Sequence, residues 1–226
     1  MKKIVYGVYG ASGFGKEVIP LVRDHAIKSG GTKEDIFFID DALEHDDCLN
    51  HYKILSFDDF LAIDADEYYI SIAIANSKIR EKLTGKCHEN NIKLLDVKAN
   101  NVVESDEIAI GEGMILSPFV TLTSNIKIGK SFQANIYSYV AHDCIIGDYV
   151  TFAPGVKCNG NVIIEDHAYI GTGVILHQGK PNKPLKIGKG AVIAAGSVVT
   201  KSVPEGITVF GNPAIELTKE NLKRRR

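Results

Sequence analysis

The sequence predicts an α/β domain followed by an all-β domain built as a parallel β-helix. Over the first hundred or so residues, apolar runs alternate with segments of helical period, and from Ile108 a six-residue repeat replaces them. The 226 residues are 45% hydrophobic and 24% charged, which is typical of a globular protein. We place the domain boundary near residue 90, which gives domains 1–90 and 91–226.

The N-terminal half has the pattern of a βαβ fold. An apolar run is followed by a glycine-rich turn and a helical segment, and two more apolar runs follow, the second leading into another helix. This order predicts a small parallel sheet. The expected strands are 3–9, 36–39 and 68–74, and the expected helices are 16–23 and 78–83.

The repeat is defined by its third position, which is apolar in every hexad from Ile108 to Gly179. Residues 180–184 contain two prolines and interrupt the register, which resumes at Ile187, so we expect them to form an extruded loop. The third positions of the twelve hexads are Ile110, Leu116, Leu122, Ile128, Ala134, Val140, Ile146, Phe152, Cys158, Ile164, Ile170 and Leu176.

A longer period shows how the hexads are arranged. Gly111, Gly129 and Gly147 lie eighteen residues apart, so three hexads make one turn. The expected structure is a triangular prism of three flat sheets, with strands stacked about 4.8 Å apart and small residues at the corners. Its core should contain one aliphatic side chain per hexad. Flat faces of this kind favour self-association.

Composition excludes several classes of function. The net charge is -2 and the only basic run, 224–226, ends the chain, so a broad nucleic-acid surface is not expected. The four cysteines form no C-x-x-C pair and no secretion signal is recognisable, which indicates the cytoplasm. No apolar run approaches the roughly 20 residues of a membrane span, so integral membrane contact is not expected.

The segment from Asn135 to Asp143 suggests a catalytic centre. It places an imidazole (His142), a carboxylate (Asp143) and a carboxamide (Asn135) on neighbouring stretches of a rigid surface. Acetyl transfer to an amine or hydroxyl needs a base, and an adjacent carboxylate can orient an imidazole for that role. The alternative is that His142 is a corner residue in a solvated turn.

The chain resembles the sugar O- and N-acetyltransferases of the left-handed β-helix superfamily, in particular the sialic acid O-acetyltransferases and the UDP-4-amino-sugar (bacillosamine pathway) N-acetyltransferases. The resemblance implies a Rossmann-like N-terminal domain and a left-handed parallel β-helix. It also implies acetyl-CoA as co-substrate, a homotrimer and a role in bacterial surface-glycan synthesis. The motifs that carry it are 9–18 (YGASGFGKEV), 38–41 (FIDD), the hexad array and 211–214 (GNPA).

By this resemblance, His142 is the general base, Asp143 its acidic neighbour and Asn135 a supporting group. The oxyanion donor is the amide of Gly160. The acetyl-CoA contacts are Gly160, Thr172, Ala195 and Thr151, the last replacing a second histidine of the bacillosamine enzymes. Cys144 and Cys158 fall at core positions, which favours direct transfer over a covalent intermediate. Lys180 and Lys183 either meet the coenzyme's phosphates or lie in a solvated loop.

The resemblance places a nucleotide-sugar pocket at the sheet edge of the first domain. Ser12, Gly13, Phe14, Asp40, Asp41 and Ala75 should line it, with Phe14 contributing packing only. The glycines are spaced G-x-x-G-x-G, which is not the dinucleotide fingerprint. Asp40 and Asp41 end a parallel strand, where such folds bind ligands, although a polar turn is an equal alternative.

The predicted activity is acetylation of the 4-amino group of a UDP-linked sugar. The alternatives are O-acetylation of sialic acid or another hydroxyl, and a trimeric sugar-nucleotide scaffold without activity. A zinc enzyme on the same prism is disfavoured, because His142, His167 and His177 occupy different hexad positions. We therefore assign no metal.

Overall fold

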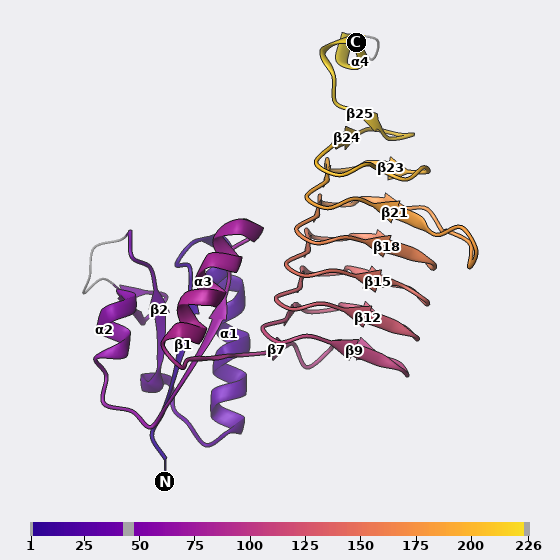
Figure 1. Ribbon diagram of the computed structural model, residues 1–226. Helices are drawn as coiled ribbons and strands as arrows, with labels where there is room; N and C mark the ends of the chain where they lie inside the picture. The colour runs from indigo at the N-terminus through magenta and orange to yellow at the C-terminus, as the bar shows by residue number, and fades with distance from the viewer. Residues whose placement is uncertain (1, 43–47, 224–226) are drawn as a thin grey trace. The chain divides into compact units, whose positions relative to one another are not determined.

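The chain forms two compact units in a computed structural model that describes residues 2–42 and 48–223 (Figure 1). The first unit contains the described residues through Lys98 together with Glu112–Ile115. The second contains Ala99–Gly111 and the described residues from Leu116 onward. The basic run 224–226 lies outside the described residues. The first unit extends past residue 90, because the strand at Lys93–Leu94 belongs to its sheet.

The first unit is built on a six-stranded sheet in the order β3-β4-β2-β1-β5-β6. Its strand pairs are parallel except β3 with β4. The three predicted strands are present, but β3, β4 and β6 were not predicted, since two of them are only two residues long. The strands are β1 (Ile4–Tyr9), β2 (Ile36–Ile39), β3 (Cys48–Leu49), β4 (Tyr52–Leu55), β5 (Glu67–Ile72) and β6 (Lys93–Leu94).

Helices cover both faces of this sheet. Side chains alternate between the two faces along each strand, so one strand contributes to two buried clusters. Tyr6 and Val8 of β1 join a buried cluster with α1, whereas Val5 and Tyr9 join a second cluster with α2 and α3. The longest helix, α1, runs well past the predicted end because Ala26 is also buried against the sheet. The helices are α1 (Gly13–Lys28), the 3-10 turn η1 (Lys33–Asp35), α2 (Phe57–Leu61) and α3 (Ser77–Glu89).

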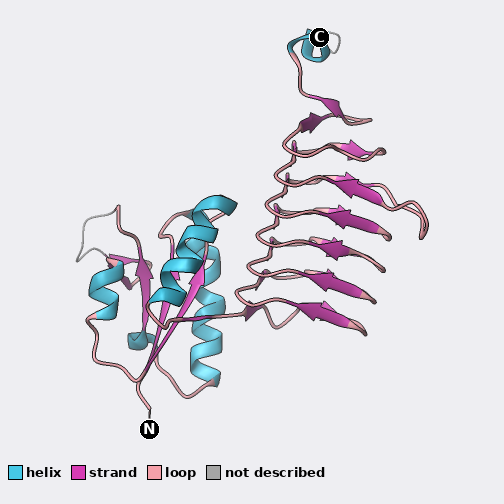
Figure 2. Cartoon of the chain, viewed as in Figure 1, coloured by secondary structure: helices cyan, strands magenta, loops and turns pink. Residues whose placement is uncertain are grey.

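The second unit consists of stacked coils whose short strands form three sheets (Figures 1 and 2). All pairs between coils are parallel. The eight-stranded sheet contains β13 (Gln133–Ala134), β16 (Thr151–Phe152), β19 (Tyr169–Ile170), β22 (Val192–Ile193), β24 (Thr208–Phe210) and the antiparallel β25 (Ile215–Glu216). Its order ends with β10 (Ile115–Leu116) and β7 (Val97–Lys98), of which Val97, Lys98 and Ile115 are grouped with the first unit.

The other two sheets complete the prism. The six-stranded one contains β8 (Val103–Glu104), β11 (Thr121–Leu122), β14 (Tyr139–Val140), β17 (Lys157–Cys158), β20 (Ile175–Leu176) and β23 (Val198–Val199). The five-stranded one contains β9 (Ile108–Ile110), β12 (Ile126–Ile128), β15 (Ile145–Ile146), β18 (Val162–Ile164) and β21 (Leu185–Ile187).

The register confirms the predicted repeat. Thr121 pairs with Tyr139, and Tyr139 with Lys157, each eighteen positions on. Across the insert 180–184 the offset grows by its five residues, so that Ile175 pairs with Val198. The predicted third positions are buried from Leu116 through Leu176, while Ile110 in the first coil is half-buried.

The expectation of one core side chain per hexad was wrong. First positions also point inward, because residues two apart in a strand share a face. Most of them are apolar and fully buried. Ser138 is polar, and its hydroxyl donates to the Ala153 carbonyl and accepts from the Val156 amide. The buried first positions include Val120, Ile126, Phe132, Cys144, Val150, Val156, Val162, Ala168 and Val174.

The corners of the prism also differ from expectation. Each edge is a column of residues with positive φ. Several of these residues are bulky rather than small, and aromatic rings stack in pairs along two of the edges. The first edge contains Glu107, Asn125, Asp143 and Asn161. The second contains Phe119, Tyr137, Gly155, Gly173 and Gly196, and the third contains Ser131, Tyr149, His167, Gly190 and Gly206.

The chain ends in a short helix, α4 (Lys219–Lys223). Leu217 and Leu222, which we expected to anchor a cap, are each 45% exposed, so the described chain does not bury them. Among the described residues, no helix has the length and apolar character needed to span a bilayer.

Candidate functional site

His142 and Asp143 form a hydrogen-bonded pair on the first edge of the prism. His142 Nδ1 lies 2.7 Å from Asp143 Oδ2, and both side chains are about half exposed. The His142 contact is the main cause that lowers the pKa of Asp143, and a hydrogen bond from Asn125 adds to it. An ionised Asp143 can only accept, so Nδ1 donates to it, and in the neutral imidazole Nε2 keeps its lone pair.

Gly160 lies one coil further along the same edge, against the imidazole. A Cβ added to Gly160 would stand 2.5 Å from both Cε1 and Nε2 of His142, so this position has room only for glycine. The Gly160 N–H makes no hydrogen bond within the described chain. The edge therefore combines a free basic nitrogen with an unused backbone donor.

Asn135 is not part of this pair. Its carboxamide donates to the Phe152 carbonyl at 3.0 Å, and it lies two residues before Tyr137 on the second edge. The six residues between Asn135 and His142 include the corner at Tyr137 and the strand β14, so the two side chains are separated by one side of the triangle. A role for Asn135 beside the imidazole remains a prediction.

The predicted coenzyme positions fall on two different edges. Gly160 is on the first, whereas Thr172 and Ala195 are exposed and precede Gly173 and Gly196 on the second. The Thr172 carbonyl accepts from the amide of Gly196, the residue after Ala195, so Thr172 and Ala195 lie on adjacent coils.

Thr151, Cys144 and Cys158 are buried. Thr151 is only 2% exposed, which leaves its side chain little access to a coenzyme on the surface of this chain. The sulfur atoms of Cys144 and Cys158 lie 4.0 Å apart in the core. Contact with Cys144 and complete burial hold the pKa of the Cys158 thiol well above its usual range, so this thiol is a poor nucleophile.

In the first unit, three chain segments meet at one sheet edge. β1 pairs in parallel with both β2 and β5, so the segments that follow Tyr9, Ile39 and Ile72 leave the sheet side by side. These segments carry all the predicted sugar-nucleotide residues. Ser12, Gly13 and Ala75 are exposed, and Phe14 packs partly against the core.

The glycine-rich turn is tightly folded at this edge. Gly10 has a φ of 106°, and a Cβ on Gly15 would lie 1.9 Å from the Gly10 carbonyl oxygen. Ser12 is the N-cap of α1, yet its side chain makes no capping hydrogen bond. The amides at the start of the helix are thus available to an anion.

Asp40 ties the glycine-rich turn to the end of β2. Its Oδ2 accepts from the Ala11 amide and its Oδ1 from the Ala42 amide, each at 3.1 Å. A carboxylate accepts about four hydrogen bonds. Asp40 therefore positions the loop and retains capacity for a ligand.

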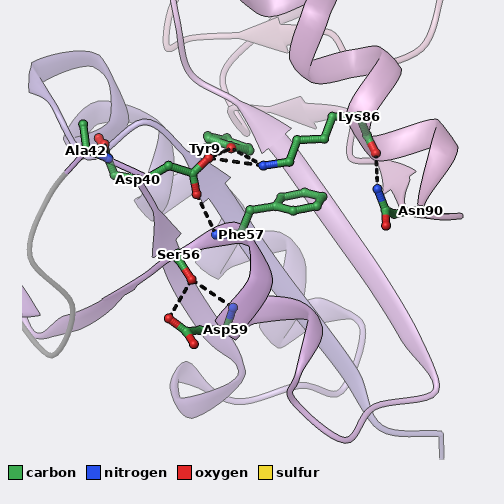
Figure 3. Close-up of polar contacts among 9 residues, drawn as sticks. Tyr9, Asp40, Ala42, Ser56, Phe57, Asp59, Lys86 and Asn90 are labelled. Atoms are coloured by element: carbon green, nitrogen blue, oxygen red, sulfur yellow. Dashed lines mark hydrogen bonds and ion pairs between the residues drawn. The ribbon is translucent and has the colours of Figure 1, made fainter.

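Asp41 belongs to a cluster with Tyr9, Phe57 and Lys86, and Figure 3 labels these last three residues. It accepts from the Tyr9 hydroxyl, from the Phe57 amide at 2.8 Å and from Lys86 Nζ at 3.2 Å. The Lys86 ammonium also lies 3.9 Å from the centre of the Phe57 ring. Burial opposes the ionised form, but these hydrogen bonds hold the pKa of Asp41 below its usual value.

This cluster was missed in the sequence. Its members come from β1, the segment after β2, α2 and α3, and neither Tyr9 nor Lys86 stands in a local pattern that predicts the contact. Only the pairing of β1 with β2, together with the face that Tyr9 occupies, places its hydroxyl beside Asp41. In the part of the chain that the structure describes, no three His, Cys, Asp or Glu side chains are grouped to hold a metal.

Comparison with known proteins identifies both parts of the chain. The family model described as "PglD N-terminal domain" matches residues 7–87. The model described as "Bacterial transferase hexapeptide (six repeats)" matches residues 125–160. The chain is 49% identical over 215 residues to the GDP-perosamine N-acetyltransferase of Escherichia coli O157:H7, covering 95% of this chain and 97% of the relative.

Solved structures share the whole architecture. WeeI from Acinetobacter baumannii AYE is 60% identical with a TM-score of 0.92, covering 95% of this chain and all of that one. The acetyltransferase domain of PglB from Neisseria gonorrhoeae FA1090, in complex with acetyl coenzyme A, is 27% identical with a TM-score of 0.83. It covers 96% of this chain and all of that one.

Replacing Gly160 with alanine should disturb the His142–Asp143 pair. The added methyl group would overlap the imidazole, so the ring must move. Because the His142 hydrogen bond is the main cause of the lowered pKa of Asp143, that pKa should rise toward its ordinary value in Gly160→Ala. Carboxyl-carbon NMR titration measures it, with Gly85→Ala, where a Cβ meets open space, as control. An unchanged Asp143 titration would contradict the contact.

Asp41→Asn should destabilise the first unit by roughly 0.5–1 kcal/mol at pH 7, since the Asp41 side chain is 47% exposed and solvent screens its ion pair. Because the pKa of Asp41 is lowered in the folded state, its ionised form stabilises the fold fully at pH values above 3.8, the ordinary pKa of the group. That contribution is lost as pH falls through the folded-state pKa, so the difference from wild type should vanish under acidic conditions. Urea unfolding between pH 3 and 7 tests this, with exposed Asp64→Asn as control. A difference that widens on acidification would refute it.

Proposed function

The chain belongs to the hexapeptide-repeat sugar acetyltransferases, and from this membership we propose that it moves acetyl from acetyl-CoA to the amino group of a nucleotide-linked 4-amino sugar. The observation that carries the proposal is the 49% identity to a GDP-perosamine N-acetyltransferase over nearly the full length of both chains. The pairing of His142 with Asp143 beside the free Gly160 amide supports it.

His142 is the proposed general base. Its Nδ1 is engaged by Asp143, so Nε2 is free to take the proton that the amine loses as its nitrogen attacks the thioester carbonyl. The adjacent carboxylate stabilises the imidazolium that forms and holds the ring in one orientation. The proton can then pass to the departing thiolate, which leaves His142 neutral for the next cycle.

The Gly160 amide is the proposed donor to the oxyanion. Negative charge develops on the carbonyl oxygen as the new bond forms, and a fixed N–H aimed at that oxygen stabilises it. Gly160 is suited to this because its N–H has no partner in the described chain and its Cα lies against the base. Transfer is direct, since Cys144 and Cys158 are both fully buried in the core and cannot reach the thioester.

The nucleotide is proposed to bind at the sheet edge formed by Ser12, Gly13, Phe14, Asp40 and Ala75. The unpaired amides at the start of α1 suit a diphosphate, and Asp40 retains hydrogen-bonding capacity. The sequence analysis favoured a UDP-linked sugar. The relative at 49% identity acts on a GDP-linked one, so we take guanosine as the first candidate.

We also propose a homotrimer, as expected for flat-faced prisms of this family. Exposed apolar and aromatic side chains on the second unit support association, among them Phe119, Tyr137 and Ile145. Light scattering of the purified protein should give about three times the chain mass of 24.6 kDa. A monomer at micromolar concentration would contradict the trimer without bearing on the chemistry.

The activity is tested by thiol release from acetyl-CoA with GDP-perosamine, a UDP-linked 4-amino sugar and free sialic acid as acceptors. We expect turnover with the first. His142→Ala should lower kcat by about 100-fold or more and leave nucleotide-sugar affinity unchanged, because the base acts only on the reacting atoms. His25→Ala, at an exposed histidine near the C-terminal end of α1, is the control.

Turnover only with the UDP-linked sugar would restore the UDP prediction, and turnover only with sialic acid would indicate O-acetylation. If no acceptor gives thiol release and coenzyme A does not bind, the acetyltransferase activity is refuted and a sugar-nucleotide scaffold is favoured.

A further inference from the structure

Two buried thiols lie inside the prism beside the peptide bond that joins Asn159 to Gly160. Cys144 and Cys158 are on consecutive coils, and their sulfur atoms are 4.0 Å apart. The Cys144 sulfur lies 3.3 Å from the Asn159 carbonyl oxygen, whereas the Cys158 sulfur lies 3.8 Å from it. A thiol is a weak hydrogen-bond donor, so the closer sulfur is placed to donate to this oxygen. The proposed mechanism gives neither thiol a chemical step.

The Cys144 thiol has one proton, and the surrounding contacts indicate where it is donated. A second carbonyl, that of His142, is farther from the sulfur at 3.6 Å and already accepts from the Asn161 amide. No backbone N–H of the described chain donates to the Asn159 carbonyl. A carbonyl that faces the core without a donor is costly, so the Asn159 oxygen is the preferred acceptor for the thiol.

Cys144 departs from the hydrocarbon pattern of its column. The register aligns it with Ile126 on the coil before and with Val162 on the coil after. All three side chains are fully buried, but of the three only Cys144 offers a hydrogen-bond donor. The donor therefore occurs at the coil whose neighbouring corner carries Gly160.

The geometry of the peptide bond converts this contact into a direction for the Gly160 N–H. The Asn159 carbonyl and the Gly160 N–H belong to one planar trans peptide unit, in which the two bonds point in opposite directions. The carbonyl points into the core toward Cys144, so the N–H points outward. The exposed His142 imidazole packs against Gly160 at the same corner. The thiol thus directs the amide toward the surface that carries the proposed base.

The atoms on either side of this peptide unit are held by other hydrogen bonds. The Asn159 carboxamide donates to the Leu176 carbonyl and accepts from the Tyr139 hydroxyl, each at 2.8 Å. On the other side, the Gly160 carbonyl accepts from the Gly179 amide at 2.9 Å. With both ends fixed, the remaining freedom is a tilt of the peptide plane between them, and the buried thiol opposes that tilt.

We propose that Cys144 is a positioning residue for acetyl transfer: its thiol fixes the peptide plane that aims the Gly160 N–H at the oxyanion. This inference rests on the proposed function, which makes that N–H the oxyanion donor. The thiol touches no reacting atom and is neither oxidised nor acetylated. It acts by keeping a backbone donor preorganised, so that the donor needs no reorientation as charge develops.

The first test compares Cys144→Ala with Cys144→Ser in coenzyme A release with GDP-perosamine as acceptor. Alanine removes the donor, so kcat and kcat/KM should fall together by about 5-fold or more, with KM for both substrates unchanged. Serine restores a donor at the same position and should keep kcat within about 2-fold of wild type. The pH dependence of kcat, which reports the base, should not move. The control is Val174→Ala, which removes buried volume without removing a donor and should keep wild-type kcat.

The contact itself is tested by infrared spectroscopy of the S–H stretching band, which needs no turnover. Subtracting the spectrum of Cys144→Ala from that of the wild-type protein isolates the Cys144 band. A hydrogen-bonded S–H group stretches at a lower frequency than a free one, so this band should lie below that of Cys87, assigned in the same way with Cys87→Ala. Cys87 is the reference because its thiol is fully buried in an apolar cluster of the first unit.

A Cys144 band at the Cys87 frequency, or a wild-type kcat in Cys144→Ala, would overturn the proposal. Equal losses in the alanine and serine variants would also overturn it, because the side chain would then matter for packing alone. If the wild-type protein releases no coenzyme A with any acceptor, the proposed function fails, and with it the catalytic use of the amide. The S–H band still decides in that case whether Cys144 holds the peptide.

Discussion

The register between successive coils is the constraint on which the rest of the second unit depends. Each strand pairs in parallel with the strand eighteen residues later, and first and third hexad positions both point inward. A slip of one residue would turn every inward side chain outward, so burial holds the register firmly. Outward residues therefore stack in columns, and the first edge brings His142, Gly160, Gln178 and Lys201 into one line.

The contents of that column support the proposal that His142 is the base. Asp143 occupies a corner with a φ of 59°, which brings its carboxylate back to the imidazole of the preceding residue. Asn125, one coil before, supports Asp143 with a hydrogen bond of 3.3 Å. Gly160, one coil after, leaves the space that the ring needs. The proposed base and its carboxylate thus come from one corner and the proposed backbone donor from the next coil, so the regular stacking of coils positions all three.

Periodic features of this fold could be predicted from the sequence, whereas contacts between distant segments could not. The hexads predicted the buried positions from Leu116 to Leu176 and the loop at 180–184, because every coil repeats one local rule. Aromatic corners such as Tyr137 were not expected, since left-handed backbone normally favours small residues. Asn135 was grouped with His142 by proximity in sequence, although a corner separates them. The cluster of Tyr9, Asp41 and Lys86 depends on tertiary packing of four elements.

At the acidic strand end of the first unit, contacts within the protein already engage the carboxylates that were expected to bind ligand. Asp40 and Asp41 were predicted to bind ligand directly, yet each carboxylate already accepts hydrogen bonds from the protein. Asp40 holds the glycine-rich turn, and Asp41 holds the start of α2 and the Lys86 ammonium. A ligand at this edge consequently meets loops that are already ordered, which lowers the entropy cost of binding. At the proposed nucleotide site, Asp40 would contribute by holding the loop that carries the amides of Gly13 and Phe14, and selectivity between nucleotides would depend on the shape of that loop.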